Sequence, residues 1–179
     1  MKALLLNGSP RKGNTYAALE ALKKGFANID GIEIQEILAG EAAVSPCLAC
    51  ESCKDGNGCV FDDDTNDIMD AVVEADMIVF ATPVYWWGIT AQLKLIIDKF
   101  YSRGDQLAEC KKQVGVIVIG QLSQEDTQYE IIRKQFKCIS GYLGWDITFC
   151  NTYSAYDATD LISDSDAMAE IEGLWKKIK

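Results

Sequence analysis

The segment from Gly8 to Thr15 has the composition of an anion-binding turn. It reads Gly-Ser-Pro-Arg-Lys-Gly-Asn-Thr and follows an apolar run, Ala3 to Leu6. A helix should start at its end, and the first N–H groups of a helix have no partners within that helix, so they attract anions together with the helix dipole. Hydroxyl and amide side chains add further donors, and Arg11 and Lys12 add positive charge. We therefore expect a phosphate group at this turn.

Two common nucleotide-binding motifs do not describe the turn. It lacks the GxGxxG pattern, and although Gly8 to Thr15 has the spacing of GxxxxGK[ST], Asn14 stands where that motif requires lysine. The missing lysine disfavours an NTPase. The alternative to phosphate binding is a turn that only reverses the chain and caps a helix, since Gly, Ser, Pro and Asn are ordinary turn residues. The number of donors within one turn favours phosphate.

A second segment, Pro83 to Gly88, places three consecutive aromatic side chains after the apolar run Met77 to Thr82. Tyrosine and tryptophan combine a flat apolar face with a polar tip, and Gly88 permits close approach of the backbone to a ligand. This segment can cover a flat ring with a polar edge. The alternative is that Trp86 and Trp87 pack in a subunit interface or under a helix.

Four of the seven cysteines lie close together with the spacing C-x2-C-x2-C-x5-C: Cys47, Cys50, Cys53 and Cys59. Four thiolates from one loop can hold a [4Fe-4S] cluster. Zinc ranks below the cluster because structural zinc sites usually pair two separated C-x-x-C elements. The third alternative, four free thiols, stays as open as the cluster. The other three cysteines are expected to be buried as small apolar residues: Cys110, Cys138 and Cys150.

Composition excludes several functions. The chain of 179 residues is 49% hydrophobic and 25% charged, which is typical of one globular domain over residues 1–179 with a cysteine-rich loop at 46–61. Its formal net charge of −10 argues against nucleic acid or an anionic membrane as the partner. It contains no histidine, which excludes a Ser-His-Asp triad and a histidine metal site.

The N-terminal run Met1 to Leu6 is too short for a secretion signal, and the longest clean apolar run, Met77 to Ala81, is far below the ~20 residues that span a bilayer. We therefore expect a cytoplasmic protein.

Strands and helices must alternate to position these segments. Five apolar runs predict strands: Ala3 to Leu6, Ile32 to Leu38, Met77 to Thr82, Val114 to Ile119, and 145–149. Helical periodicity lies after each of them: 14–26, with Asn14 or Thr15 as N-cap, then 65–73, 93–100, 127–143 and 168–178. This alternation predicts a doubly wound α/β fold with a parallel sheet and helices on both faces. Ligands of such sheets bind beyond the carboxyl ends of the strands, so the loops after Asn7, Pro83 and Gly120 should meet. The cysteine loop follows the second strand, and we expect it at the same edge.

Two stretches, GSPRKGNT at 8–15 and TPVYWWGITAQLKLIIDKF at 82–100, resemble the NADPH-dependent FMN reductase family of flavodoxin-like proteins. The cysteine loop and the Asp62-Asp63-Asp64 run are similar as well, so the resemblance covers roughly the first 103 residues. It implies a flavodoxin-like three-layer sandwich whose five-stranded parallel sheet has the order 2-1-3-4-5.

The resemblance also implies a cofactor site. The FMN phosphate would be held by Ser9, Arg11, Gly13, Asn14 and Thr15. The isoalloxazine ring would be lined by Pro83, Val84, Tyr85, Trp86, Trp87 and Gly88, with Gly120 completing the site. No side chain is expected to act as a catalytic acid, because a flavin accepts hydride itself. The four-cysteine loop is similar to that of the iron-sulfur flavoproteins, and the family implies a homodimer or homotetramer.

The leading hypothesis is an FMN-dependent NAD(P)H oxidoreductase that reduces a flavin, a quinone or another small acceptor. The alternative is an iron-sulfur flavoprotein that carries electrons between protein partners. An acidic surface would suit docking to a basic redox partner.

Overall fold

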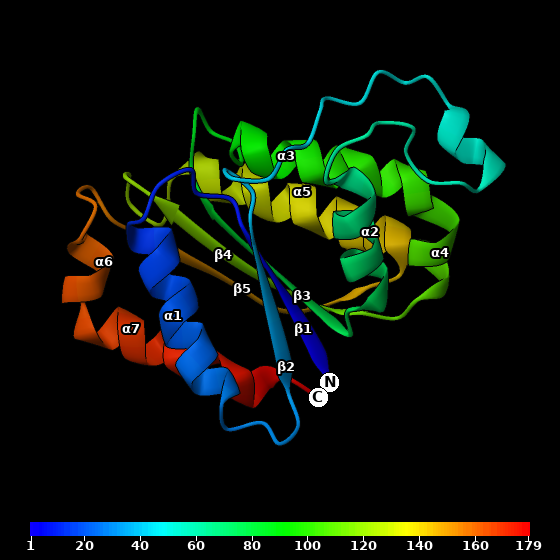
Figure 1. Ribbon diagram of the computed structural model, residues 1–179. Helices are drawn as coiled ribbons and strands as arrows, with labels where there is room; N and C mark the ends of the chain where they lie inside the picture. The colour runs from blue at the N-terminus through cyan, green and yellow to red at the C-terminus, as the bar shows by residue number, and fades with distance from the viewer.

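In the computed structural model, which describes residues 1–179, five strands form one parallel sheet (Figure 1). The strands are β1 (Lys2–Asn7), β2 (Glu33–Leu38), β3 (Met77–Pro83), β4 (Gln113–Gly120) and β5 (Asp146–Ser154). Their order is β2-β1-β3-β4-β5, and all four pairings are parallel. The predicted doubly wound fold and its strand order are confirmed.

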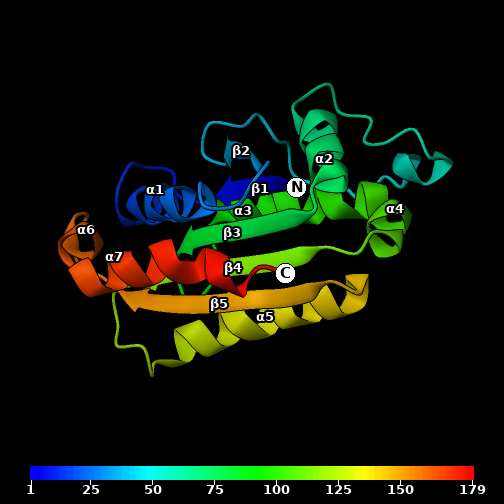
Figure 2. The same cartoon turned by 90° about the horizontal axis from the view of Figure 1, so that it is seen from below.

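Helices cover both faces of the sheet. The α-helices are α1 (Asn14–Phe26), α2 (Thr65–Glu74), α3 (Ala91–Asp98), α4 (Gly104–Glu109), α5 (Thr127–Leu143), α6 (Asp160–Ser163) and α7 (Ser165–Glu172). Three 3-10 turns add to them: η1 (Ser52–Asp55), η2 (Lys99–Arg103) and η3 (Gly173–Lys177). One apolar core joins the sheet to α2, α3, α4 and α5, and a second joins it to α1, α6 and α7, which lie side by side in Figure 2.

The apolar runs are continuous because both faces of the central strands are buried. In β1, Leu4 and Leu6 face the α2–α5 side while Ala3 and Leu5 face α1. The residues of β3 alternate in the same way, and all six from Met77 to Thr82 are buried. This packing gives the loops at the carboxyl edge a rigid base.

Several local predictions were wrong. Neither Asn14 nor Thr15 caps α1, because the helix already begins at Asn14 and its N-cap, Gly13, has no side chain to accept a hydrogen bond. Cys138 is exposed on α5, while Cys110 and Cys150 are only partly covered. The short helices α4 and α6 have too few residues to produce a periodic pattern, and the last predicted helix divides into α7 and η3. None of the helices has the length and apolar character needed to cross a bilayer.

Gly25 permits the close approach of α1 to α7, which leads to a test. A Cβ at Gly25 would lie 2.0 Å from the carbonyl oxygen of Glu172, whereas a Cβ at Gly141 of α5 would meet nothing within 4 Å. Replacing an exposed helical glycine by alanine normally stabilises by about 0.5–1 kcal/mol, so Gly141→Ala should gain that amount. Gly25→Ala should instead lose about 1–3 kcal/mol through overpacking. Urea unfolding followed by circular dichroism measures both, and the same sign for the two variants would contradict this packing.

Candidate functional site

The loops at the carboxyl edge of the sheet are tied to one another by hydrogen bonds. The Thr90 hydroxyl donates to the Gly8 carbonyl at 2.6 Å, and the Asn14 side-chain amide donates to the Asp157 carbonyl at 2.7 Å. The Val84 N–H donates to the Ile119 carbonyl, near the end of β4, at 2.8 Å. The predicted meeting of the loops after β1 and β3 is confirmed, the loop after β5 joins them, and the aromatic turn starts beside the end of β4.

The start of α1 presents a row of backbone donors without acceptors. Neither a backbone nor a side-chain acceptor in the chain takes the N–H groups of residues 12–16, and the N-cap provides no side-chain bond. In contrast, α3, α5 and α7 each begin with a side chain that accepts from the first turn: Thr90, Asp126 and Asp164. Such bare N–H groups at the positive end of a helix dipole form an anion site.

The predicted phosphate ligands of this turn have different local roles. Ser9 shapes the turn, since its hydroxyl donates to the Arg11 carbonyl at 2.8 Å and accepts from the Arg11 N–H at 3.3 Å. Asn14 accepts from the Leu161 N–H at 3.2 Å as well as donating to the loop after β5, so its amide positions that loop. Gly13 and Thr15 lie within the bare turn itself. Arg11 is exposed and makes no ion pair, so its charge is available at the surface.

Thr90 joins the first turn to the aromatic turn, and the sequence reasoning missed it. Its fully buried hydroxyl binds the Gly8 carbonyl and also caps α3 by accepting from the Leu93 N–H at 3.3 Å. Gly8 allows this close approach, because a Cβ there would lie only 3.0 Å from the Cβ of Leu93. A threonine directly before the apolar pattern of α3 is an N-cap signal. That signal was available, but nothing in the sequence linked it to Gly8.

The aromatic segment forms a strained hairpin turn. Tyr85 and Gly88 exchange two backbone hydrogen bonds of 2.9 and 3.0 Å, and the residues between them, Trp86 and Trp87, have φ of 47° and 59°. This is the geometry of a type I′ turn, which normally holds Asn-Gly, and a left-handed conformation costs roughly 1–2 kcal/mol for a residue with a Cβ. Trp86 is 89% exposed and Trp87 49%. The alternative that both rings pack under a helix of this chain is wrong.

Gly120 lies between the aromatic turn and α5. A Cβ there would lie 2.8 Å from the Tyr129 hydroxyl, and 3.0 Å from both the side-chain nitrogen of Gln128 and a methyl of Val84. The Gln128 nitrogen is buried and has no acceptor in the chain. Exposed aromatic faces, an orphaned amide and bare N–H donors therefore share one edge, a combination that fits a flat heterocycle with a phosphate tail.

The cysteine loop is anchored at both ends by the acidic run before α2. Asp63 accepts from the N–H groups of Ser45 and Thr65 at 2.8 and 3.0 Å, and Asp64 accepts from the Ala43 N–H at 2.7 Å. Partial burial opposes ionisation of Asp63, but the hydrogen bonds from Thr65 and Ser45 outweigh it and hold the pKa of this carboxyl well below its ordinary value. Two carboxylates at the end of the loop therefore bind backbone groups at its start and hold the two ends together.

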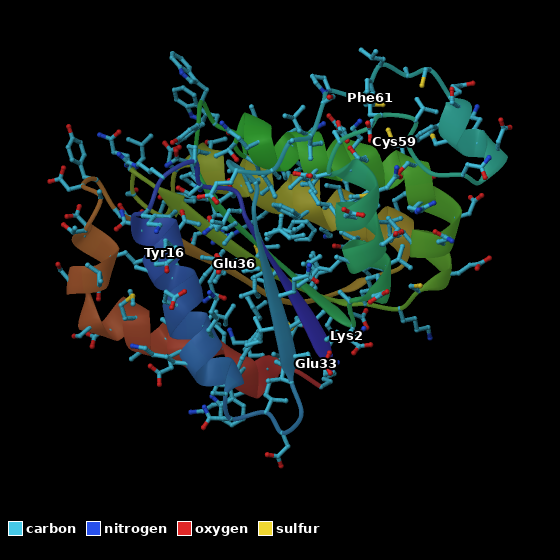
Figure 3. The ribbon with its side chains drawn as sticks, viewed as in Figure 1. Lys2, Tyr16, Glu33, Glu36, Cys59 and Phe61 are labelled. Carbon is cyan, nitrogen blue, oxygen red and sulfur yellow. The ribbon has the colours of Figure 1, made fainter.

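The loop does not stay at the carboxyl edge, so the expectation that it would lie beside the aromatic turn was wrong. It crosses the α2–α3 layer, and its cysteines lie against the end of α3 and η2. Figure 3 shows Tyr16 at the start of α1, with Cys59 and Phe61 far from it above α2. The eight residues of α3 separate the aromatic turn from this region by about 12 Å.

All four cysteines of the loop line one small cavity, together with Phe61 and Lys99. None forms a disulfide, and no three acidic or thiol groups are close enough to hold a single metal ion. Zinc needs four ligands on one ion, whereas a [4Fe-4S] cluster takes one thiolate at each iron, so its ligands stand further apart. The lining of the cavity includes the four cysteines that a [4Fe-4S] cluster requires as ligands. Hydrogen bonds from the backbone and hydroxyl of Ser52, with the charge of Lys99, lower the pKa of the Cys50 thiol.

The chain is similar to several known proteins in sequence and in fold. The sequence model of the family described as NADPH-dependent FMN reductase matches residues 1–137. An iron-sulfur flavoprotein of Methanocaldococcus jannaschii is 36% identical over 100 residues, which are 55% of this chain and 51% of that protein. A Bacillus subtilis protein named as an NAD(P)H-dependent FMN-containing oxidoreductase is 25% identical over 99% of this chain and 98% of its own. The structure of an FMN-dependent NADH-azoreductase from Bacillus anthracis superimposes with a TM-score of 0.70 at 15% identity, covering 99% of both chains; at that identity the likeness shows the fold.

The chain spans about half the length of the iron-sulfur flavoproteins it matches, since the first three are covered over 51%, 54% and 52% of their length.

The positive φ of Trp87 can be separated from the role of its ring. Trp87→Gly relieves the left-handed strain, whereas Trp87→Ala removes the ring but keeps a Cβ in the same conformation. We expect the glycine variant to be more stable than the alanine variant by about 1–2 kcal/mol. Urea unfolding of the two proteins measures the difference. Equal stabilities would contradict the left-handed turn.

Proposed function

Because the chain belongs to the NADPH-dependent FMN reductase family, we propose that it is an FMN-dependent oxidoreductase that passes electrons from NAD(P)H to a flavin, a quinone or another small acceptor. The row of bare N–H groups at residues 12–16, on the same edge as the exposed aromatic turn, carries this proposal. The acidic, histidine-free composition fits it, since neither nucleic acid binding nor histidine catalysis is required.

Residues of the first turn would bind the phosphate. The N–H groups around Gly13 and Thr15 supply donors, and Arg11 supplies charge from the exposed side of the turn. Ser9 and Asn14 keep the turn and the loop after β5 in place rather than offering free donors. These fixed donors lower the ordering cost of binding, because they need not move when the anion arrives.

The aromatic turn and Gly120 would hold the ring. The chain from Pro83 to Gly88 would line one side, and the orphaned amide of Gln128 lies next to Gly120. When bound, FMN would supply the hydride-accepting centre, while the protein would bind and orient it. The exposed rings of Trp86 and Trp87 would offer apolar faces beside the flavin, on which nicotinamide and acceptor would stack in turn.

No side chain at this edge is needed as a proton donor. The phenol of Tyr129 at this edge is engaged with the carbonyls of Leu122 and Tyr153 at 2.9 and 3.1 Å, and burial raises its pKa. Because the bound flavin would itself accept the hydride, the residues at the site would act by binding and orientation.

A second candidate function is favoured by the cysteine cavity. Four thiols facing one cavity would suit a [4Fe-4S] cluster, and the protein would then carry electrons between partner proteins. We further propose one domain over residues 1–179 and a cytoplasmic location and, from the family resemblance, a homodimer or homotetramer.

Anaerobic titration with FMN and steady-state turnover test the proposed function. We expect the folded protein to take up FMN and to oxidise NADPH or NADH with a quinone or ferricyanide as acceptor. Arg11→Ala should weaken FMN binding about tenfold, which corresponds to about 1.4 kcal/mol for a partly exposed charged contact. The control Lys176→Ala, far along the chain in η3, should bind FMN normally.

A protein that binds no FMN contradicts the proposal. Binding of FMN without any turnover of reduced nicotinamide would favour the electron carrier, because a carrier needs a partner reductase.

A further inference from the structure

Lys99 places an ammonium group in the cysteine cavity. The residue follows α3 and is only 2% exposed. Its Nζ lies 3.5 Å from the Cys59 sulfur and 4.3 Å from the centre of the Phe61 ring. Figure 3 shows Cys59 and Phe61 next to each other on the loop that covers this end of α3. The charge is therefore shielded from water by a thiol and an aromatic face.

No carboxylate of the chain neutralises this charge. Two acidic residues line the same cavity, but Asp98 pairs with Lys94, and Glu51 pairs with Lys54 at 2.9 Å. Burying a charge without a counter-charge is costly, so buried charges in proteins are normally paired. The Phe61 ring offers a cation–π contact, which replaces only part of the lost hydration.

The other buried lysine shows the contrast. Lys112 is 4% exposed, and its Nζ donates to the carbonyls of Val73 and Ala75 at 2.8 and 2.5 Å. Val73 lies in the last turn of α2, and Ala75 is the residue that follows this helix. Two backbone carbonyls thus stabilise the buried ammonium of Lys112. The ammonium of Lys99 contacts only the Cys59 sulfur and the Phe61 ring, which indicates that an anionic group belongs in the cavity.

We infer that Lys99 is a positioning residue for an anionic thiolate-ligated [4Fe-4S] cluster in this cavity, donating a hydrogen bond to the Cys59 sulfur and supplying the neutralising positive charge. The inference rests on the cluster of the second candidate function. Hydrogen bonds to the ligand sulfurs and the local charge are among the factors that set the potential of such clusters. Since reduction adds a negative charge to the cluster, a fixed ammonium beside it favours the reduced form.

The position of Lys99 at the end of α3 also fixes where its ammonium group lies. It follows α3 directly, and the first residue before that helix, Thr90, is bound to the Gly8 carbonyl. The ammonium is thus attached to the end of a helix whose start is bound to the first turn, and not to the cysteine loop itself.

Four variants test this role: Lys99→Met, Lys99→Gln, Lys99→Arg and the control Lys54→Met. Methionine keeps an apolar stem, glutamine keeps a donor without charge, and arginine keeps the charge. Lys54 lies in η1 beside Cys53, but its side chain is 57% exposed, so its charge is screened by water.

Each protein is purified without oxygen, and its iron, acid-labile sulfide and FMN are measured separately. The midpoint potential is then determined by redox titration with electron paramagnetic resonance of the reduced cluster.

We expect iron and sulfide in the wild type, a lower midpoint potential in Lys99→Met and Lys99→Gln, and values near the wild type in Lys99→Arg and Lys54→Met. Loss of the cluster in the two uncharged variants, with retention in Lys99→Arg, also supports the inference. A wild-type potential and full iron content in either uncharged variant overturns it. A wild-type protein that binds FMN but holds neither iron nor sulfide overturns both the role of Lys99 and the cluster hypothesis. The proposed FMN-dependent oxidoreductase function would still stand in that case.

Discussion

The unpaired N–H groups at residues 12–16 are the feature around which the carboxyl edge is organised. Helices α3 and α5 use a capping side chain to satisfy their first turn, but at α1 the candidate caps bond elsewhere. Ser9 closes on the Arg11 backbone and Asn14 reaches across to the loop after β5. The turn is thereby held in shape without consuming its own donors. An anion bound at this turn would complete the hydrogen bonding that the chain leaves unfinished.

The remaining parts of the carboxyl edge hold the first turn and the aromatic turn next to each other. Thr90 binds Gly8 and caps α3, so the residue that starts this helix also links the two turns. The sheet below is buried on both faces, and its stability offsets the left-handed strain stored at Trp86 and Trp87. The same helix α3 ends at the buried charge of Lys99. One short element therefore connects the proposed flavin edge to the cysteine cavity.

The sequence predicted best what depends on local pattern. Apolar runs identified all five strands, and the periodicity of α5 gave its bounds, Thr127 to Leu143, as the structure has them. The placement of the first turn and the aromatic turn at one edge followed from the rule for parallel sheets. The path of the cysteine loop was missed because it depends on contacts between distant residues. The carboxylates of Asp63 and Asp64, which hold the ends of the loop together, bind backbone groups some 20 residues away. The Thr90 to Gly8 bond was missed for the same reason, since it joins positions 82 residues apart.

The most direct test of the account is whether the bare turn of α1 receives a phosphate. Amide resonances of the isotopically labelled protein can be followed by NMR during parallel titrations with FMN and with riboflavin, which lacks the phosphate. The account predicts large shifts at residues 12–16 with FMN that riboflavin does not reproduce, while both ligands shift amides of the aromatic turn. Saturation with FMN that leaves the amides of residues 12–16 unmoved would contradict it.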